Sequence, residues 1–388
     1  MKILFLQRLS GISGSERYLL SILPKLKEEG LNVSFLAIQH PKNNHLNQSF
    51  LGQLEDNNIK VYKLNTFFPI SLNLIFKTFL LIKNNNFDVL HTNLIHADFL
   101  GALVKKFLFP GLKILSVKHG YTEKFQAKSG FNISELKPDL FFWCSKWAAK
   151  QADHVVCISQ SLENFYKNST MVEEHKISTI PYGFNFSEIP IDPDVKKYRF
   201  GTPQIVITGR VEMVKQHRLF LEILPMLIKK FKELSVVMVG AGSLLEELKD
   251  LGKQLKIDNH IHWVGFQNNV HNFISNSDLM VIPSRSEGFG LVILEAWHHS
   301  LPVIGFDVPA LNDIVSNQID GILVKPFSTS DLLMETIDLL LSDKKLKSLG
   351  VSGNNKLNKL YGINTMVDST ITVLNELSQK IDSNNKLI

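Results

Sequence analysis

Short apolar runs of strand length recur along the whole chain and alternate with longer helix-like stretches. This alternation favours parallel sheets joined by crossover helices, because parallel strands need a long connection. A first series of expected strands covers residues 3–7, 32–38, 61–64, 89–91, 114–118, 154–158 and 176–180. A second series covers residues 204–208, 236–240, 261–264, 279–283, 302–306 and 321–324. The pattern predicts an α/β chain with two doubly wound sheets.

The two series are separated by residues 190–201, a segment with two prolines and no apolar period, which we interpret as a linker. A length of 388 residues also suggests two domains, since single cores seldom grow beyond about 250–300 residues. We therefore expect an N-terminal domain over residues 1–189, a second domain over residues 202–365 and a closing helix over residues 366–388. Ligands of such sheets bind beyond the carboxyl ends of the strands, so two facing sheets would form an interdomain cleft.

Composition excludes several classes of protein. The apolar run that follows Met1 is too short for a signal peptide, and no uncharged apolar stretch reaches the ~18 residues of a membrane-spanning helix. We therefore expect a cytoplasmic protein. The two cysteines, Cys144 and Cys157, are too few for a disulfide framework or a zinc site.

The formal net charge is +5, and the basic excess lies in the N-terminal half. Apolar and basic residues interleave over residues 67–83 and again over residues 103–113. One interpretation is that these segments touch the headgroup layer at the inner face of an anionic membrane. The other is that both are helices of the core with solvated lysines. Nucleic acid is not an expected partner, because no base-reading motif accompanies the lysines.

Two carboxylates eight residues apart, Glu287 and Glu295, flank a glycine loop between an expected strand and an expected helix. Glycines let a bulky ligand approach the backbone, and the N–H groups and positive dipole of a helix start favour a phosphate. Each carboxylate can accept two sugar hydroxyl hydrogen bonds. The arrangement fits a ligand with an anionic centre between hydroxyl-rich groups, which is the shape of a nucleotide sugar.

This stretch resembles the Glu-x7-Glu motif of the retaining glycosyltransferases of family 4, with Gly288, Phe289 and Gly290 after the first glutamate. Further matches run in order from residue 11 to about residue 325. The resemblance implies the GT-B fold, in which two Rossmann-like domains face an interdomain cleft and a terminal helix returns to the N-terminal domain. It also implies transfer of a sugar from a nucleoside diphosphate with retention of configuration.

The same resemblance assigns residues to the donor. Arg210 and Lys215 would clamp the diphosphate and stabilise the charge of the leaving group. Glu287, with the amides of residues 288–291, would hold the hydroxyls of the transferred sugar, and Glu295 would hold those of the ribose. The other donor-binding positions would be Gly14, Gly209, Gly242, Phe266, Gly288, Phe289, Gly290 and Leu291.

His119 follows the expected strand 114–118 and resembles the family's His-Gly histidine, which lies near the transferred sugar. An imidazole there can bind a sugar hydroxyl or carry a proton near neutral pH. The expected catalytic set is His119, Glu287, Arg210 and Lys215. His91 and His96 resemble the acceptor-side segment, and we assign them only as residues that line it.

No metal ion and no cofactor are expected. Asp192 and Asp194 have the spacing of a metal-binding Asp-x-Asp pair, but they lie in the expected linker, away from any strand end. Two cations and two helix starts serve the diphosphate, so no metal is required. The sequence does not identify the base, and we expect UDP in preference to GDP.

The expected activity is that of a hexosyl- or N-acetylhexosaminyltransferase acting on a glycan or lipid-linked acceptor, in surface polysaccharide or lipopolysaccharide synthesis. Two alternatives stay open. One is a non-catalytic, nucleotide-sugar-binding partner in a glycan-assembly complex, because Ser15, Gln216 and residues 307–313 depart from the family pattern. The other is a nucleotide-sugar 2-epimerase, which shares the fold but needs no acceptor; the glutamate pair and the cation pair argue against it.

Overall fold

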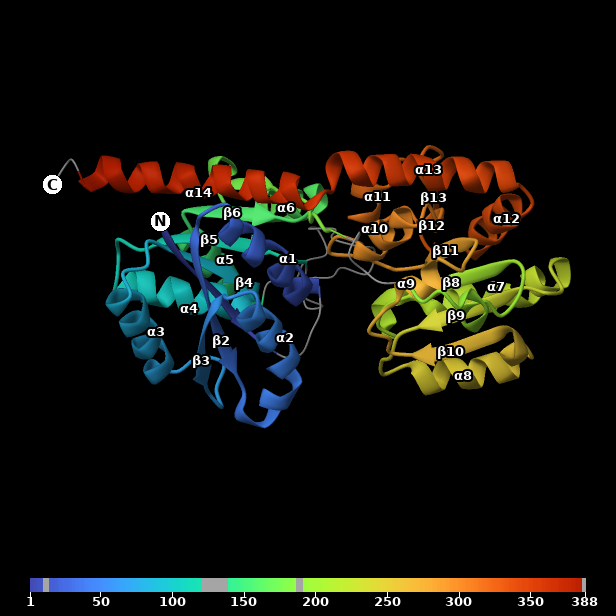
Figure 1. Cartoon of the computed structure of the whole chain (residues 1–388), viewed down its shortest axis with the longest axis horizontal. Helices are drawn as coiled ribbons and strands as arrows, with labels where there is room; N and C mark the ends of the chain where they lie inside the picture. Colours follow the sequence, from blue (N-terminus) through green and yellow to red (C-terminus); the bar gives the residue numbers. More distant parts are fainter. Residues whose placement is uncertain (10–13, 121–138, 186–190, 386–388) are drawn as a thin grey trace. The chain divides into compact units, whose positions relative to one another are not determined.

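The computed structural model describes residues 1–9, 14–120, 139–185 and 191–385 (Figure 1). The chain divides into two compact units, one of Met1–Phe184 with Gly362–Ile388 and one of Asn185–Tyr361. Gly11 of the expected glycine-rich loop and Pro190 of the expected linker lie outside the described residues. The terminal segment groups with the first unit from Gly362, where the sequence led us to expect a boundary at residue 366.

Each unit is built on a parallel sheet. Within the described residues the first sheet has the strand order β3-β2-β1-β4-β5-β6-β7, and the second has the order β10-β9-β8-β11-β12-β13. The strands of the first sheet are β1 (Lys2–Arg8), β2 (Asn32–Gln39), β3 (Lys60–Asn65), β4 (Val89–Asn93), β5 (Lys113–Lys118), β6 (His154–Cys157) and β7 (Ile177–Thr179). Those of the second are β8 (Gln204–Thr208), β9 (Ser235–Val239), β10 (Ile261–Gly265), β11 (Leu279–Ile282), β12 (Val303–Phe306) and β13 (Ile322–Val324).

Every strand expected from the sequence is present, with its ends within two residues of the expected ones. The reason is visible in the burial of the central strands. All residues of β8, β9, β11 and β12 are buried, so these strands appear in the sequence as continuous, mostly apolar runs. The expected α/β class with two doubly wound sheets is therefore confirmed.

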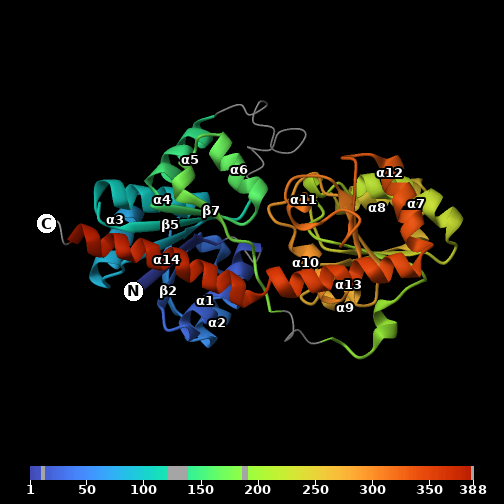
Figure 2. The same ribbon diagram turned by 90° about the horizontal axis from the view of Figure 1, so that it is seen from above.

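Helices cover both faces of the first sheet. Figure 2 shows α1, α2 and α14 on one face and α3, α4 and α5 on the other. The helices of this unit are α1 (Gly14–Glu28), α2 (Asn44–Asp56), α3 (Leu72–Asn84), α4 (Leu94–Phe107), α5 (Leu140–Gln151), α6 (Gln160–Asn168) and α14 (Ile363–Asn385). The closing helix α14 packs on α1, and the Gly183 amide lies 3.2 Å from the Met366 sulfur.

The second unit has its own helical layers. Its helices are α7 (His217–Lys230), α8 (Leu245–Gln254), α9 (His271–Ile274), α10 (Leu291–His298), α11 (Leu311–Ile314), α12 (Thr329–Leu340) and α13 (Asp343–Leu360). Ser328 and Ser342 cap the starts of α12 and α13 with their side-chain oxygens, which explains where those helices begin. The core includes fully buried Trp297 of α10, whose indole N–H donates to the Asp320 carbonyl at 3.0 Å.

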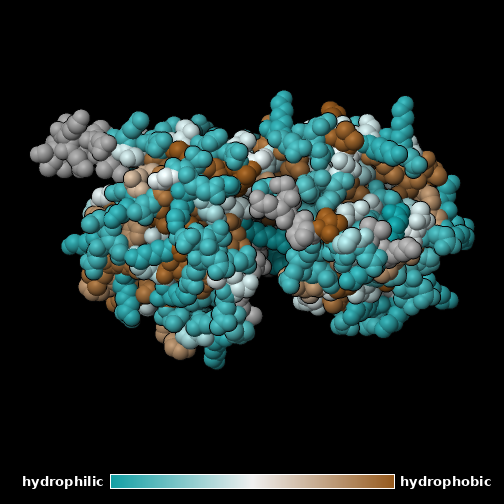
Figure 3. Space-filling view, viewed as in Figure 1, coloured by the Kyte–Doolittle hydropathy of each residue, from teal (hydrophilic) through white to brown (hydrophobic). Residues whose placement is uncertain are grey.

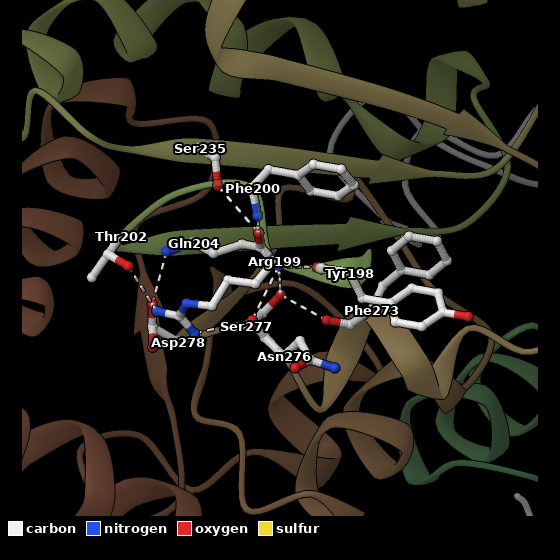
Figure 4. Close-up of polar contacts among 10 residues, drawn as sticks. All are labelled: Tyr198, Arg199, Phe200, Thr202, Gln204, Ser235, Phe273, Asn276, Ser277 and Asp278. Carbon is white, nitrogen blue, oxygen red and sulfur yellow. Dashed lines mark hydrogen bonds and ion pairs between the residues drawn. The ribbon is translucent and has the colours of Figure 1, made fainter. Parts of the chain in front are cut away.

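Residues 191–201 are not a free linker, because they pack on the second unit (Figure 4). The guanidinium of Arg199 lies 2.6 Å from a carboxylate oxygen of Asp278, which precedes β11. The Tyr198 ring meets the Phe273 ring edge-on at a centroid distance of 5.1 Å. These contacts bury the Tyr198 ring and pair two partly exposed charges, and the segment belongs to the compact unit of Asn185–Tyr361, where the sequence led us to expect a linker.

Candidate functional site

The strand order of the second sheet reverses between β8 and β11. From β8 the chain goes outward through β9 and β10 on one side, and β11 begins the strands on the other side. Such a reversal leaves a crevice beyond the carboxyl ends of the two strands, where α/β sheets bind ligands. The loops that follow them, residues 209–216 and 283–290, hold most of the donor residues expected from the sequence.

An ion pair joins these two loops. Lys215 Nζ lies 2.5 Å from Glu287 Oε1, and both side chains are mostly buried. Ser284 donates its hydroxyl to the same carboxylate oxygen at 2.6 Å. A hydrogen bond of 2.8 Å from the Arg285 amide to the Val214 carbonyl holds the loops side by side. The crevice therefore presents one cation suited to a phosphate and one carboxylate suited to sugar hydroxyls.

Arg210 is the second cation of the expected clamp, and its side chain is exposed. Its guanidinium forms no hydrogen bond or ion pair with the described part of the chain. The neighbouring Glu212 accepts hydrogen bonds from the Ser243 hydroxyl at 2.6 Å and the Ser243 amide at 3.0 Å. These bonds lower the pKa of Glu212 and tie the loop after β8 to the loop after β9. The guanidinium is thus carried on an anchored loop and is free to meet an anion.

Gly242 is required by a close backbone approach. A Cβ at this position would lie 2.2 Å from the Val211 carbonyl oxygen. That oxygen accepts a hydrogen bond of 3.1 Å from the Leu244 amide, and the Val211 amide donates to the Ala241 carbonyl at 3.0 Å. The loops after β8 and β9 therefore touch backbone to backbone, and the expected Gly-x-Gly segment supports the position of the cation loop.

The helix α10 begins directly after the glycine loop. Gly290, with φ of +92°, turns the chain into the helix, and it has no side chain that could cap the first-turn amides. Those amides and the helix dipole face the loop end, as anion sites at helix starts do. Glu295 is the fifth residue of the helix and is buried. The two glutamates of the motif thus lie on a loop and one turn into a helix.

The two aromatic residues expected at the donor differ in exposure. The Phe289 side chain is buried, and its ring lies 5.9 Å from the Tyr361 ring, so it packs in the core and only its backbone faces the loop. Phe266, after β10, is 70% exposed. An exposed ring at a strand end is available to stack on a nucleotide base. Its contact with a base stays a prediction.

In the first unit, His119 directly follows β5, and both of its ring nitrogens have partners. Nε2 lies 2.8 Å from the Asn93 side-chain oxygen, and Nδ1 lies 2.5 Å from the Tyr182 hydroxyl. Because an amide oxygen only accepts, Nε2 carries the proton and Nδ1 accepts from the tyrosine. Burial first, and then the charges of His91 and Lys118, lower the pKa of His119 to about 3. Of the two expected roles, the low pKa favours binding of a sugar hydroxyl over carrying a proton near neutral pH, and the role of His119 stays a prediction.

His91 does not line an acceptor site. It is fully buried in β4, and its ring stacks on the Phe5 ring at a centroid distance of 4.0 Å. Burial lowers its pKa to about 3. Its ring points into the core, and because every residue of β4 is buried, alternation along the strand does not reveal this. His96, in the first turn of α4, is half-buried, and its pKa is lowered by burial and by Arg8, so its acceptor role stays a prediction.

Gly14 is the first residue of α1, as the expected glycine-rich loop requires. Ser15 follows it within the helix and does not have positive φ, so a glycine is not needed there. Ser15 donates its hydroxyl to the buried carboxylate of Glu16 at 3.1 Å, and the Gln7 amide donates to the same carboxylate. The departure from the family pattern at Ser15 is thus compatible with the local backbone.

The sequence analysis missed three residues that the structure brings to these sites. Asn93 and Tyr182 hold the His119 ring, and Ser284 holds the Glu287 carboxylate. Asn93 ends β4, and the other two follow β7 and β11. Each of these polar residues stands at or just beyond the carboxyl end of a strand, where α/β sheets bind ligands, and that position could have identified them.

The described ranges contain no group of three or more His, Cys, Asp or Glu side chains arranged to hold a metal ion. In the Asp-x-Asp pair, Asp192 accepts hydrogen bonds from the Asp194 amide at 3.0 Å and from the Tyr198 hydroxyl at 2.7 Å, and these lower its pKa. Both bonds join residues within the short segment 192–198. In the same ranges, no helix combines the length and the hydropathy needed to span a membrane.

Comparison with known proteins places both units in one family. The family model described as Glycosyltransferase Family 4 matches residues 12–188, and the model described as Glycosyl transferases group 1 matches residues 191–354. Together the two matches cover every strand of the two sheets except β1, and they include the loops after β8 and β11.

Curated relatives are similar over nearly their full length. The UDP-Gal:alpha-D-GlcNAc-diphosphoundecaprenol alpha-1,3-galactosyltransferase of Escherichia coli is 23% identical over 382 residues, which cover 95% of this chain and 95% of the relative. The N-acetyl-alpha-D-glucosaminyl L-malate synthase of Bacillus anthracis is 22% identical over 386 residues, which cover 97% and 96%. Among solved structures, Anabaena Alr3699/HepE in complex with UDP and glucose matches with a TM-score of 0.80 at 18% identity, covering 97% of this chain and 99% of that one. The fold is the GT-B fold.

Proposed function

This chain belongs to glycosyltransferase family 4, and on that premise we propose that it moves a sugar from a UDP-sugar to a hydroxyl of a glycan or lipid-linked acceptor, with retention of configuration. The observation that carries the proposal is the Lys215–Glu287 pair at the reversal of the second sheet. The pair sets a phosphate-binding cation beside a hydroxyl-binding carboxylate. A nucleotide sugar likewise has its phosphates next to the hydroxyls of its sugar.

The donor diphosphate is bound by Arg210, Lys215 and the first-turn amides of α10 in this proposal. Arg210 has no competing partner among the described residues, so it needs no rearrangement to meet an anion. Lys215 is held by Glu287 until the donor arrives, and it then shares its charge between the carboxylate and the phosphate. These fixed positive groups stabilise the charge that grows on the leaving nucleoside diphosphate. Catalysis without a metal ion is part of the proposal.

The transfer step uses the leaving group as the base. The bond between the anomeric carbon and the phosphate oxygen breaks, and the acceptor oxygen bonds to the same carbon from the face that the diphosphate leaves. The acceptor proton passes to the departing phosphate oxygen, so no protein nucleophile is needed. In this proposal neutral His119 does not shuttle a proton, in line with its pKa of about 3, and it binds a sugar hydroxyl by exchanging one of its partners, Asn93 or Tyr182.

The acceptor class rests on the relatives. The Escherichia coli relative is named for a lipid-linked GlcNAc acceptor and the Bacillus anthracis relative for malate, at nearly equal identity. We propose the first class, a hexosyl- or N-acetylhexosaminyl transfer to a glycan or lipid-linked acceptor at the inner membrane face, in surface polysaccharide or lipopolysaccharide synthesis. Because the two relatives are named for different acceptors, the likeness to them supports the proposed donor more strongly than the proposed acceptor.

Thermal unfolding with a panel of nucleoside diphosphates tests the donor site. UDP at 100 times its dissociation constant stabilises the folded chain by about 2.7 kcal/mol, which raises the unfolding midpoint by several degrees. Arg210→Ala and Glu295→Gln should each reduce that rise. Arg218→Ala removes an exposed arginine of α7 that pairs with Glu222, and it serves as the matched control that keeps the rise.

The outcomes separate the alternatives. No rise with any nucleotide would overturn the proposal. Binding without turnover over a broad acceptor panel would favour a non-catalytic partner in a glycan-assembly complex. Loss of donor with rearranged sugar and no acceptor would favour a 2-epimerase.

A further inference from the structure

Helix α3 presents an apolar stripe to solvent. Leu72, Phe76 and Leu80 recur every four residues and therefore lie on one side of the helix, where they are 86%, 53% and 36% exposed. The opposite side of the helix is buried through Leu74 and Ile82. The helix thus has an apolar side packed on the sheet and a second apolar side that no described residue covers.

A groove between α4 and α5 continues this surface. It has a volume of about 430 Å³ and is lined by Phe99, Leu103, Phe107, Trp143, Cys144 and Trp147. Phe107 and Trp143 at its rim are 70% and 56% exposed. Large aromatic side chains at a rim, with no polar residue among those that line the groove, favour an apolar occupant.

The stripe and the groove belong to one face of the first unit. Figure 2 shows α3, α4 and α5 side by side, and Phe79 of α3 meets Phe109, just after α4, at a ring centroid distance of 6.5 Å. Figure 3 shows apolar surface over the position of α3 and α4. We call this the α3–α5 face and define it by its exposed apolar residues, which are Leu72, Phe76, Leu80, Phe107, Leu140 and Trp143.

The charges around the α3–α5 face are of one sign. The helices carry Lys77, Lys83, Lys105, Lys106, Lys146 and Lys150, and α3 and α5 contain no Asp or Glu. The acidic residues nearby are engaged: Asp98 pairs with buried Lys118 at 2.5 Å, and Asp153 pairs with Lys105 at 2.5 Å. Asp139 caps the start of α5 through a hydrogen bond of 2.8 Å from the Phe142 amide. Lys105 is therefore taken up by Asp153, and the face combines exposed aromatic rings with five lysines for which the described residues offer no ion pair: Lys77, Lys83, Lys106, Lys146 and Lys150.

We propose that the α3–α5 face binds the surface of an anionic lipid bilayer. Aromatic and aliphatic side chains enter the boundary between headgroups and acyl chains, while lysines beside them attract anionic headgroups. A second copy of this chain is a poorer occupant, because a two-fold contact through the same face would set lysines against lysines. The unpaired lysines on these helices, whose one carboxylate, Asp98, is engaged by Lys118, favour an anionic partner.

The inference goes beyond the proposed transfer, because binding to a bilayer needs neither donor nor turnover. Crossover helices run from the carboxyl edge of a parallel sheet back to its amino edge, so Leu140 and Trp143 at the start of α5 lie toward the edge that carries His119. A bilayer on this face would therefore lie beside the edge of the unit where an acceptor is expected.

Co-sedimentation of the full chain with lipid vesicles tests the proposal. Vesicles of phosphatidylcholine with ~30% phosphatidylglycerol should bind the protein at low salt, and pure phosphatidylcholine vesicles should bind it at least tenfold less, since each lysine near the surface contributes roughly fivefold in affinity. Leu72→Ser with Phe76→Ser, and separately Lys77→Glu with Lys106→Glu, should each lower binding at least tenfold. All four side chains are exposed, so folding is preserved.

Matched controls lie in the second unit. Met226→Ser with Met334→Ser removes two other exposed apolar side chains, and Lys229→Glu with Lys230→Glu reverses two exposed charges. Both should leave vesicle binding unchanged. The nucleotide-induced thermal shift is measured on every variant, and its retention in the face variants keeps this test separate from that of the donor site.

Three results would overturn the proposal. The first is no sedimentation with anionic vesicles at low salt. The second is an equal loss of binding in the face variants and their controls. The third is a dimer in sedimentation velocity that dissociates in the face variants, which would assign the α3–α5 face to a second copy of the chain.

Discussion

Single residues carry the departures of this chain from its family pattern, and Gln216 is the clearest. It stands where the family has a glycine, and its φ of +53° and ψ of +32° lie in the left-handed region. An L-residue pays roughly 1–2 kcal/mol there, and glycine avoids most of that cost. This backbone conformation explains why a glycine suits position 216, at the end of the loop that carries Arg210 and Lys215.

We expect Gln216→Gly to raise the free energy of unfolding by up to about 1 kcal/mol, because relief of the left-handed strain exceeds the added freedom of the unfolded chain. Gln53→Gly is the matched control, since Gln53 lies within α2 and glycine there should cost about 1 kcal/mol. Urea unfolding of both variants measures the contrast. A loss of stability in both would show that the backbone at Gln216 is not strained.

Burial of His91 predicts a pH dependence of stability. Its pKa is lowered from 6.5 to about 3 by burial, so the folded chain holds it neutral while the unfolded chain takes up a proton. Its contribution is therefore intact above pH 6.5 and is lost as the pH falls toward 3, by about 1.4 kcal/mol per unit. In His91→Gln that loss is absent, so the stability difference from wild type should shrink by about 2 kcal/mol between pH 6.5 and pH 5.

Urea unfolding at pH 7.5, 6.5 and 5 measures the difference. Tyr18→Phe is the control, because it removes the hydroxyl 3.5 Å from His91 Nε2 but keeps the titrating ring. Its stability difference should be constant over this range. A difference that is equally constant for His91→Gln would contradict the prediction.

At the scale of elements, the segment of residues 191–201 behaves as part of the second unit. Its Arg199 side chain reaches Asp278 and the Asn276 carbonyl, at 2.6 and 3.1 Å (Figure 4). The same Asp278 carboxylate accepts a hydrogen bond of 2.7 Å from the Gln204 amide at the start of β8. The segment therefore fixes the edge where β8 and β11 begin.

We expect Arg199→Ala to lower the free energy of unfolding by roughly 1–3 kcal/mol, because it leaves a partly buried carboxylate with fewer partners. Lys197→Ala is the control, since its side chain is mostly exposed and its pair with Asp192 is long at 3.6 Å. Chemical unfolding monitored by circular dichroism compares them. Equal effects would indicate that the segment does not stabilise the unit.

At the scale of the whole molecule, the chain ends on the unit where it began. Helix α14 belongs with the first unit, and Leu374 within it is fully buried. Apart from Gly14, the residues expected to bind the donor lie in the second unit. Stability of the first unit and nucleotide binding by the second should therefore respond to different substitutions.

Leu374→Ala should lower the unfolding free energy of the first unit by about 2–5 kcal/mol, the range for a large-to-small change in a core. The midpoint increase caused by UDP should persist in the variant. Leu360→Ala, an exposed position at the end of α13, is the control with little effect on either quantity. Differential scanning calorimetry with and without UDP makes both measurements. Loss of the UDP effect in Leu374→Ala would contradict the independence of the two units.

The sequence by itself determined the strands, the two doubly wound sheets and the position of the loops whose residues we expect to bind the donor. Strands such as β8 and β11 are buried on both faces, so their composition alone marks them. The loops that follow these two strands carry Arg210, Lys215 and Glu287. Residues at the carboxyl ends of neighbouring parallel strands must gather at one edge, and for that reason their proximity could be predicted.

Only the tertiary structure decided what each side chain touches. It paired Lys215 with Glu287, buried His91 and Phe289, and surrounded His119 with Asn93 and Tyr182. These outcomes depend on partners far apart in the chain, which local pattern does not contain. The sequence also left the exposure of the α3–α5 face undecided. Its apolar and basic residues fit a core helix and an interfacial helix equally well, and only the packing shows which sides of the helices are covered.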